Sequence, residues 1–271
     1  MRVERARAGT ESRQPGKSQE PGQVQSLRRA LSLLEHVAAA GEGLTVTEAA
    51  RAAGLPISTA HRLLTTLESA RYVRFEPGAN LWQIGVQAFA TGNAFTRTRD
   101  IVAIARPHLR RLMEETRETA NLYIHDDGRA VCMAQVESRQ MMRAIARPGG
   151  RTALHCSGAG KAILAYLDAR SVERILTDHG QPPITHATLT DRAALEADLA
   201  AVRRRGWALD DEEHEIGLRC VAACVLDEHA EPAAALSISG PLARIDDARM
   251  AAMGALLAKA AAELSALYGK R

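Results

Sequence analysis

The chain is 271 residues long, with 46% hydrophobic and 25% charged residues, a balance that is ordinary for a globular protein and a length that suits two domains. No apolar run approaches the roughly 20 residues of a membrane-spanning helix, and the first 23 residues contain no apolar segment of a secretory signal, so we expect a cytoplasmic protein. Its four cysteines are too few for a disulfide framework and are expected to be free thiols.

The formal net charge of +3 is distributed unevenly. Residues 1–84 hold 11 basic and 8 acidic side chains, whereas residues 85–271 hold 24 of each. Positive charge concentrated in one third of a chain is typical of a segment that meets phosphate, although much of this excess lies near the N-terminus. Charge alone is therefore weak support for nucleic-acid binding.

The N-terminal 23 residues mix Arg, Glu, Gln, Gly, Ser and Pro with almost nothing apolar. Such a segment cannot bury enough surface to offset its ordering entropy, so we expect a disordered arm. Apolar residues then recur at helical spacing over residues 27–38, and Gly41 and Gly43 end the predicted helix.

A short helix over residues 48–53 follows, with Thr47 as its expected N-cap. Residues 54–56 (Gly-Leu-Pro) force a turn, because Gly permits a left-handed conformation and Pro cannot continue a helix. Ser58 is expected to cap the next helix, over residues 59–70.

Two extended segments, residues 72–75 and 81–84, flank a Pro-Gly turn and predict a β-hairpin. Helix, short helix, turn, second helix and hairpin together are typical of a winged helix-turn-helix. The alternative is a small helical domain with a hairpin and no role in DNA binding.

The rest of the chain alternates predicted strands and helices. We expect a helix over residues 86–100 and another from residue 101, strands at 120–125, 130–136 and 141–145, helices at 161–167, 172–178 and 192–205, strands at 218–226 and 233–239, and a closing helix over 246–268. The fold class is therefore α+β with a mainly antiparallel sheet, which suits a ligand-sensing domain.

Four segments together resemble the IclR family of bacterial transcriptional regulators: residues 24–31 (VQSLRRAL), 54–64 (GLPISTAHRLL), 154–161 (LHCSGAGK) and 217–223 (GLRCVAA). The resemblance covers residues 24–268 in the family's order and spacing. It implies a winged helix-turn-helix over 24–85, a linker helix over 86–100 and a GAF-like effector domain over 101–271. It also implies a homodimer or homotetramer, a dimer of dimers, on a palindromic double-stranded operator.

Four residues at the start of the helix predicted over residues 59–70 are suited to contact base edges in a DNA groove. Short polar and long basic side chains near the start of an exposed helix reach base edges and phosphates, and the residues of this kind are Ser58, Thr59, His61 and Arg62. Arg62 is the best candidate for a bidentate bond to guanine. Ser58 has an equally good alternative role as a simple N-cap.

The resemblance implies further DNA contacts outside that helix. Arg29 and Thr45 match positions that touch the DNA backbone, and the region of Asn80 matches the wing. Many relatives have Lys or Arg where this chain has Ile57. This departure removes one expected phosphate contact.

Residues 155–161 (HCSGAGK) are similar to a nucleotide-binding loop but fail its pattern. His155 stands where the first Gly is required, and Ala162 replaces the Ser or Thr after Lys161. A glycine-rich turn into a helix remains, whose free N–H groups would favour a small carboxylate. A plain tight turn that packs the helix on the sheet is the alternative.

Ser237 and Ser239, two apart on a predicted strand, face the same side. The resemblance to glyoxylate- and pyruvate-sensing members implies that the effector is surrounded by Gly158, Ala159, Asp210, Cys220, Ser237 and Ser239. The hydroxyls and helix amides would bind a carboxylate, and Asp210 would accept from a hydroxyl or a hydrated aldehyde. With only 3% aromatic residues, we expect glyoxylate or a similar 2-oxo acid, with an aromatic or other organic acid as the alternative.

No cofactor, metal or catalytic role is expected. A zinc site of His155, His214, Cys220 and Cys224 lacks closely paired ligands, and the acidic residues after Asp210, up to Glu213, are read as a solvated loop. An acyl-transfer enzyme built on Cys156 and His155 is disfavoured, because adjacent residues on one strand point to opposite faces. A constitutive DNA-binding or scaffold protein, with a C-terminal domain that only oligomerises, remains a further alternative.

Overall fold

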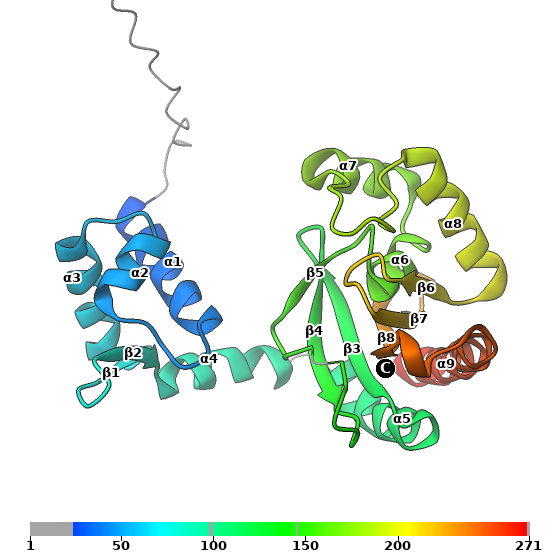
Figure 1. Cartoon of the computed structure of the whole chain (residues 1–271), viewed down its shortest axis with the longest axis horizontal. Coiled ribbons are helices and arrows are strands. Elements are labelled where there is room, and N and C mark those ends of the chain that lie inside the picture. The colour runs from blue at the N-terminus through cyan, green and yellow to red at the C-terminus, as the bar shows by residue number, and fades with distance from the viewer. Residues whose placement is uncertain (1–23, 98–99, 145, 270–271) are drawn as a thin grey trace, which may run out of the picture. The chain divides into compact units, whose positions relative to one another are not determined.

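The computed structural model describes residues 24–97, 100–144 and 146–269 (Figure 1). The expected disordered arm, residues 1–23, lies outside the described residues. The chain divides into two compact units, with the boundary between Phe95 and Thr96 in the sequence. Each unit is described by itself.

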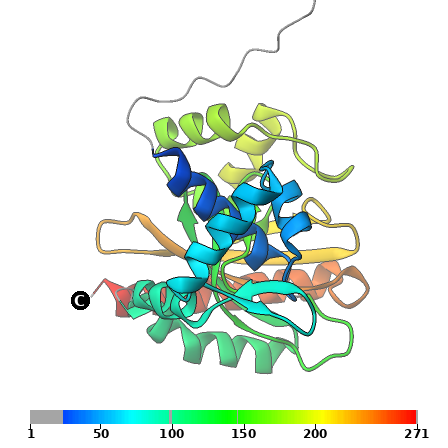
Figure 2. The ribbon, with the colours of Figure 1, turned by 90° about the vertical axis from the view of Figure 1, so that its left-hand side faces the viewer.

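The first unit is a helix-turn-helix followed by a hairpin (Figures 1 and 2). Its elements in chain order are α1 (Gln25–Ala39), α2 (Val46–Ala52), α3 (Ile57–Ser69), β1 (Val73–Glu76), β2 (Leu81–Ile84) and most of α4 (Val86–Arg97). Leu33 and Val37 of α1, Leu64 of α3 and Trp82 of β2 are buried in one core. The helices thus bury part of the apolar stripes that their sequences predict, whereas Leu27 and Leu31 of α1 stay exposed.

The hairpin is extended by a third short segment. Leu44, before α2, forms an antiparallel bridge with Trp82, with backbone N–O distances of 3.0 and 2.7 Å. Because Trp82 packs into the core while its backbone pairs with Leu44, the wing is fixed both to the core of the helices and to the segment before α2. The predicted winged helix-turn-helix fold is confirmed.

Two predicted helix caps were wrong. Thr45, not Thr47, caps α2: its hydroxyl accepts from the Glu48 amide at 3.3 Å, and the Glu48 carboxylate accepts from the Thr45 amide at 2.9 Å. This reciprocal capping box begins the helix two residues earlier than expected. Ser58 lies inside α3, which starts at Ile57 behind Pro56, so Ser58 is not an N-cap.

The second unit is built on a six-stranded antiparallel sheet of order β5-β4-β3-β8-β7-β6. The strands are β3 (Thr119–Asp126), β4 (Arg129–Val136), β5 (Arg151–Ala153), β6 (Ala208–Asp211), β7 (Leu218–Leu226) and β8 (Pro232–Pro241). Strands β7 and β8 agree closely with the prediction. The α+β fold class with an antiparallel sheet is confirmed.

Helices cover both faces of this sheet (Figure 1). One face packs on α5 (Asp100–Thr116) and α9 (Asp247–Tyr268), and the other on α6 (Gly158–Leu164), α7 (Ala169–His179) and α8 (Arg192–Arg205). Residues alternate along β7: Val221 and Ala223 belong to the α5/α9 core, whereas Ala222 faces the α6 side. Cys220 shares the second face, because side chains two apart on a strand point the same way.

Helix α9 is more apolar than we expected of any segment from the sequence. Over an 18-residue window its mean hydropathy is 1.4, enough by length and composition to cross a membrane. However, Met253, Leu257 and Leu264 are buried against the sheet. Packing in the core of this unit therefore accounts for the buried side of this apolar helix, which is 33% of the window.

The strand predicted at residues 141–145 was wrong. Met141 and Met142 are exposed in a loop, and residue 145 lies outside the described residues. The partner of β4 is instead β5, beyond the turn at residues 147–150, where the Cys132 amide donates to the Gly150 carbonyl at 2.9 Å. The short strand β6 was not predicted as a strand.

Candidate functional site

The turn between α2 and α3 sets the exposed face of α3. Gly54 has a φ of +63° with open space where a Cβ would stand, and the Leu55 amide donates to the Ala50 carbonyl at 2.8 Å. A left-handed residue here costs Gly little. The turn therefore reverses the chain tightly enough for α3 to pack on α2 along one side and leave the other side free.

The free side of α3 carries most of the residues that were predicted to contact DNA bases. Ser58, His61 and Arg62 are exposed and Thr59 is half-buried, whereas Ala60 and Leu64 on the opposite side are buried. Within the described part of the chain, Arg62 forms no ion pair. Its guanidinium is thus available to an external acceptor such as a base edge or a phosphate.

The residues implied to touch the DNA backbone have different surroundings. Arg29 is half-buried on α1 and lines a surface groove of about 240 Å³ together with Arg28. The hydroxyl of Thr45 donates to the Glu48 carboxylate at 2.7 Å, so it is already occupied in the capping box. Asn80 is exposed, with a φ of +56°, in the turn of the wing. Ile57, at the start of α3, is 52% exposed.

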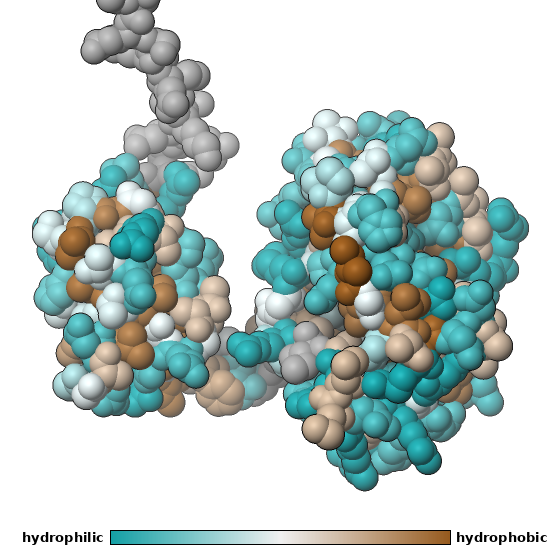
Figure 3. Space-filling model, viewed as in Figure 1, coloured by the Kyte–Doolittle hydropathy of each residue, from teal (hydrophilic) through white to brown (hydrophobic). Residues whose placement is uncertain are grey.

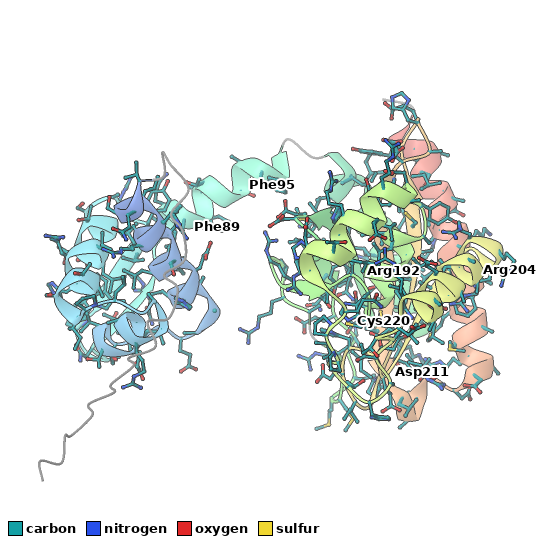
Figure 4. The ribbon with its side chains drawn as sticks, turned by 90° about the horizontal axis from the view of Figure 1, so that it is seen from above. Phe89, Phe95, Arg192, Arg204, Asp211 and Cys220 are labelled. Carbon is teal, nitrogen blue, oxygen red and sulfur yellow. The ribbon has the colours of Figure 1, made fainter. Side chains whose placement is uncertain are left out.

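The second unit contains a cavity of about 260 Å³ on the α6 face of the sheet. Four predicted effector residues line it: Ala159, Asp210, Cys220 and Ser239. Cys220 lies within the unit, behind its covering helices (Figure 4). The structure thus brings together residues from α6, β6, β7 and β8 that lie up to 80 positions apart in the chain.

Three of these residues form a row across the sheet. In the antiparallel register Asp210 pairs with Cys220, and Cys220 pairs with Ser239. Directly opposed residues share one face of a sheet, so a carboxyl, a thiol and a hydroxyl lie side by side. Ser239 Oγ donates to Cys220 Sγ at 3.2 Å, and burial raises the pKa of Cys220 to about 12.

Gly158 and Ser237 support this row without lining the cavity. A Cβ on Gly158 would lie 3.0 Å from the Cys220 carbonyl oxygen and 3.1 Å from its sulfur, so only a glycine lets α6 begin this close to β7 without a shift. Ser237 is fully buried and accepts from Asn121 Nδ2 at 3.3 Å. The two residues therefore shape the cavity from behind.

Asp210 is the most perturbed acid of the site. It is 2% exposed, and its Oδ1 accepts from the amides of Glu213 at 2.8 Å and His214 at 3.2 Å. Burial, with an added effect of the nearby Glu213 carboxylate, raises the pKa of Asp210 to about 7, although the amide bonds and Lys161 oppose the rise. Both protonation states are therefore accessible near neutral pH.

The acidic segment after Asp210 is not a solvated loop, and that prediction was wrong for Glu213. Glu213 is buried and forms an ion pair with Lys161, whose side chain is only 2% exposed. Lys161 also meets Asp198 of α8 at 2.9 Å. A buried lysine needs such partners, and this cluster fixes α6, α8 and the loop beside the cavity to one another.

Several cavity residues were missed by the sequence reasoning. The lining also includes Asn121, Tyr123, Arg147, Arg151 and His214. Asn121 was detectable in the sequence as an amide between the apolar Ala120 and Leu122 of a predicted strand, whereas the two arginines flank a Pro-Gly-Gly turn that gave no functional signal. They place positive charge at the cavity.

The alternative chemistries find little support in the geometry. His155 and Cys156 lie in the turn before α6 rather than on a strand, and His155 Nε2 donates to the Pro182 carbonyl at 3.0 Å. Burial raises the pKa of Cys156 to about 12, which leaves a protonated, unreactive thiol. Within residues 24–97, 100–144 and 146–269, no three His, Cys, Asp or Glu side chains are grouped to hold a metal ion.

A helix-turn-helix with a free polar helix face, followed by a separate sheet domain with a cavity that several polar side chains line, defines a DNA-binding transcriptional regulator. Comparison with known proteins gives the family. Residues 26–77 match the IclR helix-turn-helix domain, and residues 93–266 match the family described as bacterial transcriptional regulator IclR C-terminal. The chain belongs to the IclR family.

Similar proteins agree along nearly the whole chain. The transcriptional repressor IclR of Escherichia coli K12 is 48% identical over 250 residues, which cover 92% of this chain and 91% of that protein. The regulator BhcR of Paracoccus denitrificans is 43% identical over 92% of this chain and 88% of its own length. The crystal structure of Thermotoga maritima IclR has a TM-score of 0.74 at 28% identity, covering 90% of this chain and 98% of that one. These homologues are regulators, so the chain is a regulator and not an enzyme.

Proposed function

We propose that this regulator binds its operator under the control of a small carboxylate, with glyoxylate or a similar 2-oxo acid as the effector. The observation that supports this most strongly is the shared cavity, which brings Ala159, Asp210, Cys220 and Ser239 together. Its volume of about 260 Å³ lies just below the range of about 300–1,000 Å³ typical of sites for drug-sized ligands. A small acid fits that size.

The lining offers complementary groups to each end of such a ligand. Arg147 and Arg151 supply positive charge for a carboxylate. The Ser239 hydroxyl, whose proton goes to Cys220, would accept a hydrogen bond from the hydroxyl of a hydrated aldehyde, and the Asn121 amide would donate one to a carbonyl. Gly158 and Ser237 remain part of the proposed site as the residues that hold Cys220 and Asn121 in place.

An aromatic acid is the second candidate effector. Tyr123 lines the cavity and offers one ring face for stacking. Among the described residues of the lining it is the only Phe, Tyr or Trp, so the small acid is preferred. Isothermal titration calorimetry with glyoxylate, pyruvate and benzoate tests the choice. Tight binding of benzoate with no binding of glyoxylate would overturn it.

For the first unit, we propose that α3 enters the major groove of the operator DNA. Ser58, Thr59, His61 and Arg62 would face base edges, and Arg29 and the backbone around Thr45 would contact phosphates. The protein would act in the cytoplasm, with the predicted division into a winged helix-turn-helix (24–85), a linker helix (86–100) and a GAF-like effector domain (101–271).

A palindromic operator requires at least two copies of the chain. A second copy would cover exposed apolar side chains of the first unit, among them Leu27 and Leu31 on α1 and Val86 and Phe89 on α4. Figure 3 shows hydrophobic surface on this unit, and Figure 4 labels Phe89 on α4. We therefore propose a homodimer, or a homotetramer built from two dimers. Effector binding would favour one arrangement of the copies and thereby change the spacing of the two reading helices.

A further inference from the structure

The carboxyl group of Asp210 faces a conflict if the cavity takes an anion. Its Oδ1 is saturated by the Glu213 and His214 amides, and among the described residues Oδ2 receives no hydrogen bond. Two carboxylates cannot both stay ionised at contact distance in a site of low dielectric. A carboxylate ligand beside Asp210 therefore needs a proton between them or a cation beside them.

The nearest buried cation is already used. Lys161 of α6 pairs with Glu213 and with Asp198, so two carboxylates share one ammonium group. Arg205 approaches Asp198 at 3.6 Å and compensates that second carboxylate. This buried cluster is then neutral, and it leaves no net positive charge to offset an ionised Asp210.

The remaining charged and titratable groups around Asp210 do not neutralise it either. They are Tyr123 of β3, Cys132 of β4, Cys220 of β7, Cys156 before α6, His214 and Glu215 of its own loop, and Arg147 and Arg151 at the β5 end. Burial raises the pKa of Tyr123 and of the thiols, and lowers the pKa of His214, so these groups stay uncharged near neutral pH. Arg147 and Arg151 have exposed side chains, and Arg151 is bound to Asp126 at 2.6 Å. Solvent therefore screens the positive charge that they bring to the ligand, and this charge does not offset an ionised Asp210 in its buried position.

From this arrangement we propose that Asp210 meets the carboxylate effector as a neutral acid and donates its proton to it, so that effector binding takes up a proton and weakens as the pH rises. This inference rests on the proposed function and reverses the acceptor role first expected for Asp210. Oδ2 supplies the O–H, and Oδ1 keeps its two backbone bonds. A charge-assisted O–H···O⁻ bond is among the strongest that a protein can offer a carboxylate.

The direction of the pH effect follows from the state of Asp210 in the free protein. Its pKa, raised to about 7 by burial, leaves the acid form dominant below pH 7 and the ionised form above it. The effector's own carboxyl stays ionised from pH 6 to 8.5. Binding to the acid form alone therefore weakens by about 30-fold between pH 6 and 8.5, with uptake of about one proton per ligand at pH 8.5 and about a tenth of a proton at pH 6.

Calorimetry on the full chain tests this directly with glyoxylate as the probe. At pH 8.5, the binding enthalpy is measured in buffers of different ionisation enthalpy. The slope of the observed binding enthalpy against the ionisation enthalpy of the buffer gives the number of protons taken up. We expect a slope near one for the wild-type chain. A slope near zero, with equal affinity at pH 6 and 8.5, would overturn the inference while leaving the effector assignment intact. Absence of binding at every pH would instead contradict the proposed function.

Two variants assign the proton. Asp210→Asn keeps an acceptor for the two amides and a neutral donor for the ligand, so binding should lose both its proton uptake and its pH dependence. Glu228→Gln, a change at an exposed carboxylate outside the cavity lining, should keep both. Uptake that persists in a folded Asp210→Asn protein would contradict the assignment to Asp210, and the wild-type slope stands as a test even if that variant does not fold.

Discussion

The hydroxyl of Ser239 donates to the sulfur of Cys220, with 3.2 Å between Oγ and Sγ, across two paired strands that both face the cavity. The bond ties the only hydroxyl of the row to a thiol that stays protonated near neutral pH. Ser239 is thereby held in place, with oxygen lone pairs left for a ligand. The side chains of this row are oriented before any effector enters.

Ser239→Ala should weaken glyoxylate binding by about 1 kcal/mol, roughly fivefold, because one hydrogen bond to the ligand is lost. Operator affinity without effector should not change. Calorimetry and a gel-shift titration measure the two effects. Ser171→Ala, on α7 and outside the cavity lining, is the matched control; an equal loss of affinity in both variants would refute a role for Ser239.

Arg62→Ala should abolish specific operator binding without unfolding the chain. The side chain is exposed, and a bidentate bond to guanine contributes about 1–3 kcal/mol of discrimination. Footprinting and a thermal melt check the two parts of this prediction. Arg51→Ala, an exposed arginine on α2, should leave the footprint in place. An unchanged footprint in Arg62→Ala would show that another residue reads the operator.

Ile57→Lys should strengthen DNA binding, because it adds a cation at the first residue of α3, where the present side chain is 52% exposed. One new phosphate contact steepens the slope of log affinity against log salt by about 0.9. Binding measured at several salt concentrations gives that slope. Ile57→Gln, polar and uncharged, should leave it unaltered, and an identical slope in all three proteins would count against a phosphate beside residue 57.

Lys161→Met should destabilise the second unit by about 3–5 kcal/mol, because it leaves buried Glu213 without its cation. Denaturation by urea measures the loss. Lys161→Met combined with Glu213→Leu should recover much of it, since no buried charge is then left unpaired. If the single change cost less than about 1 kcal/mol, the cluster would not be the structural link inferred for it.

Much of the architecture could be predicted because local signals agreed. The helix over Arg192–Arg205 has an acidic cap and a terminal glycine, and the structure has those bounds. Residues 141–145 were predicted as a strand because their composition is apolar, yet Met141 is 99% exposed in a loop. Local composition does not report whether a partner strand or a covering helix is available.

The candidate site, too, could be predicted from the sequence only in part. Ser237 and Ser239 could be placed on one face by their spacing, and the resemblance supplied Asp210 and Cys220. The ion pair between Lys161 and Glu213 joins residues 52 positions apart, and nothing in either local pattern indicates that both become buried. Such long-range pairs depend on how α6 and the loop after β6 pack together, which the sequence pattern does not encode locally.

The most direct test of the whole account is a gel-shift assay on the DNA upstream of the chain's own gene, titrated with glyoxylate, pyruvate and benzoate. We expect glyoxylate to change operator affinity for the wild-type chain, and a higher concentration to be needed for Ser239→Ala. Operator affinity that is the same with every acid would contradict effector control and favour a regulator that binds DNA constitutively.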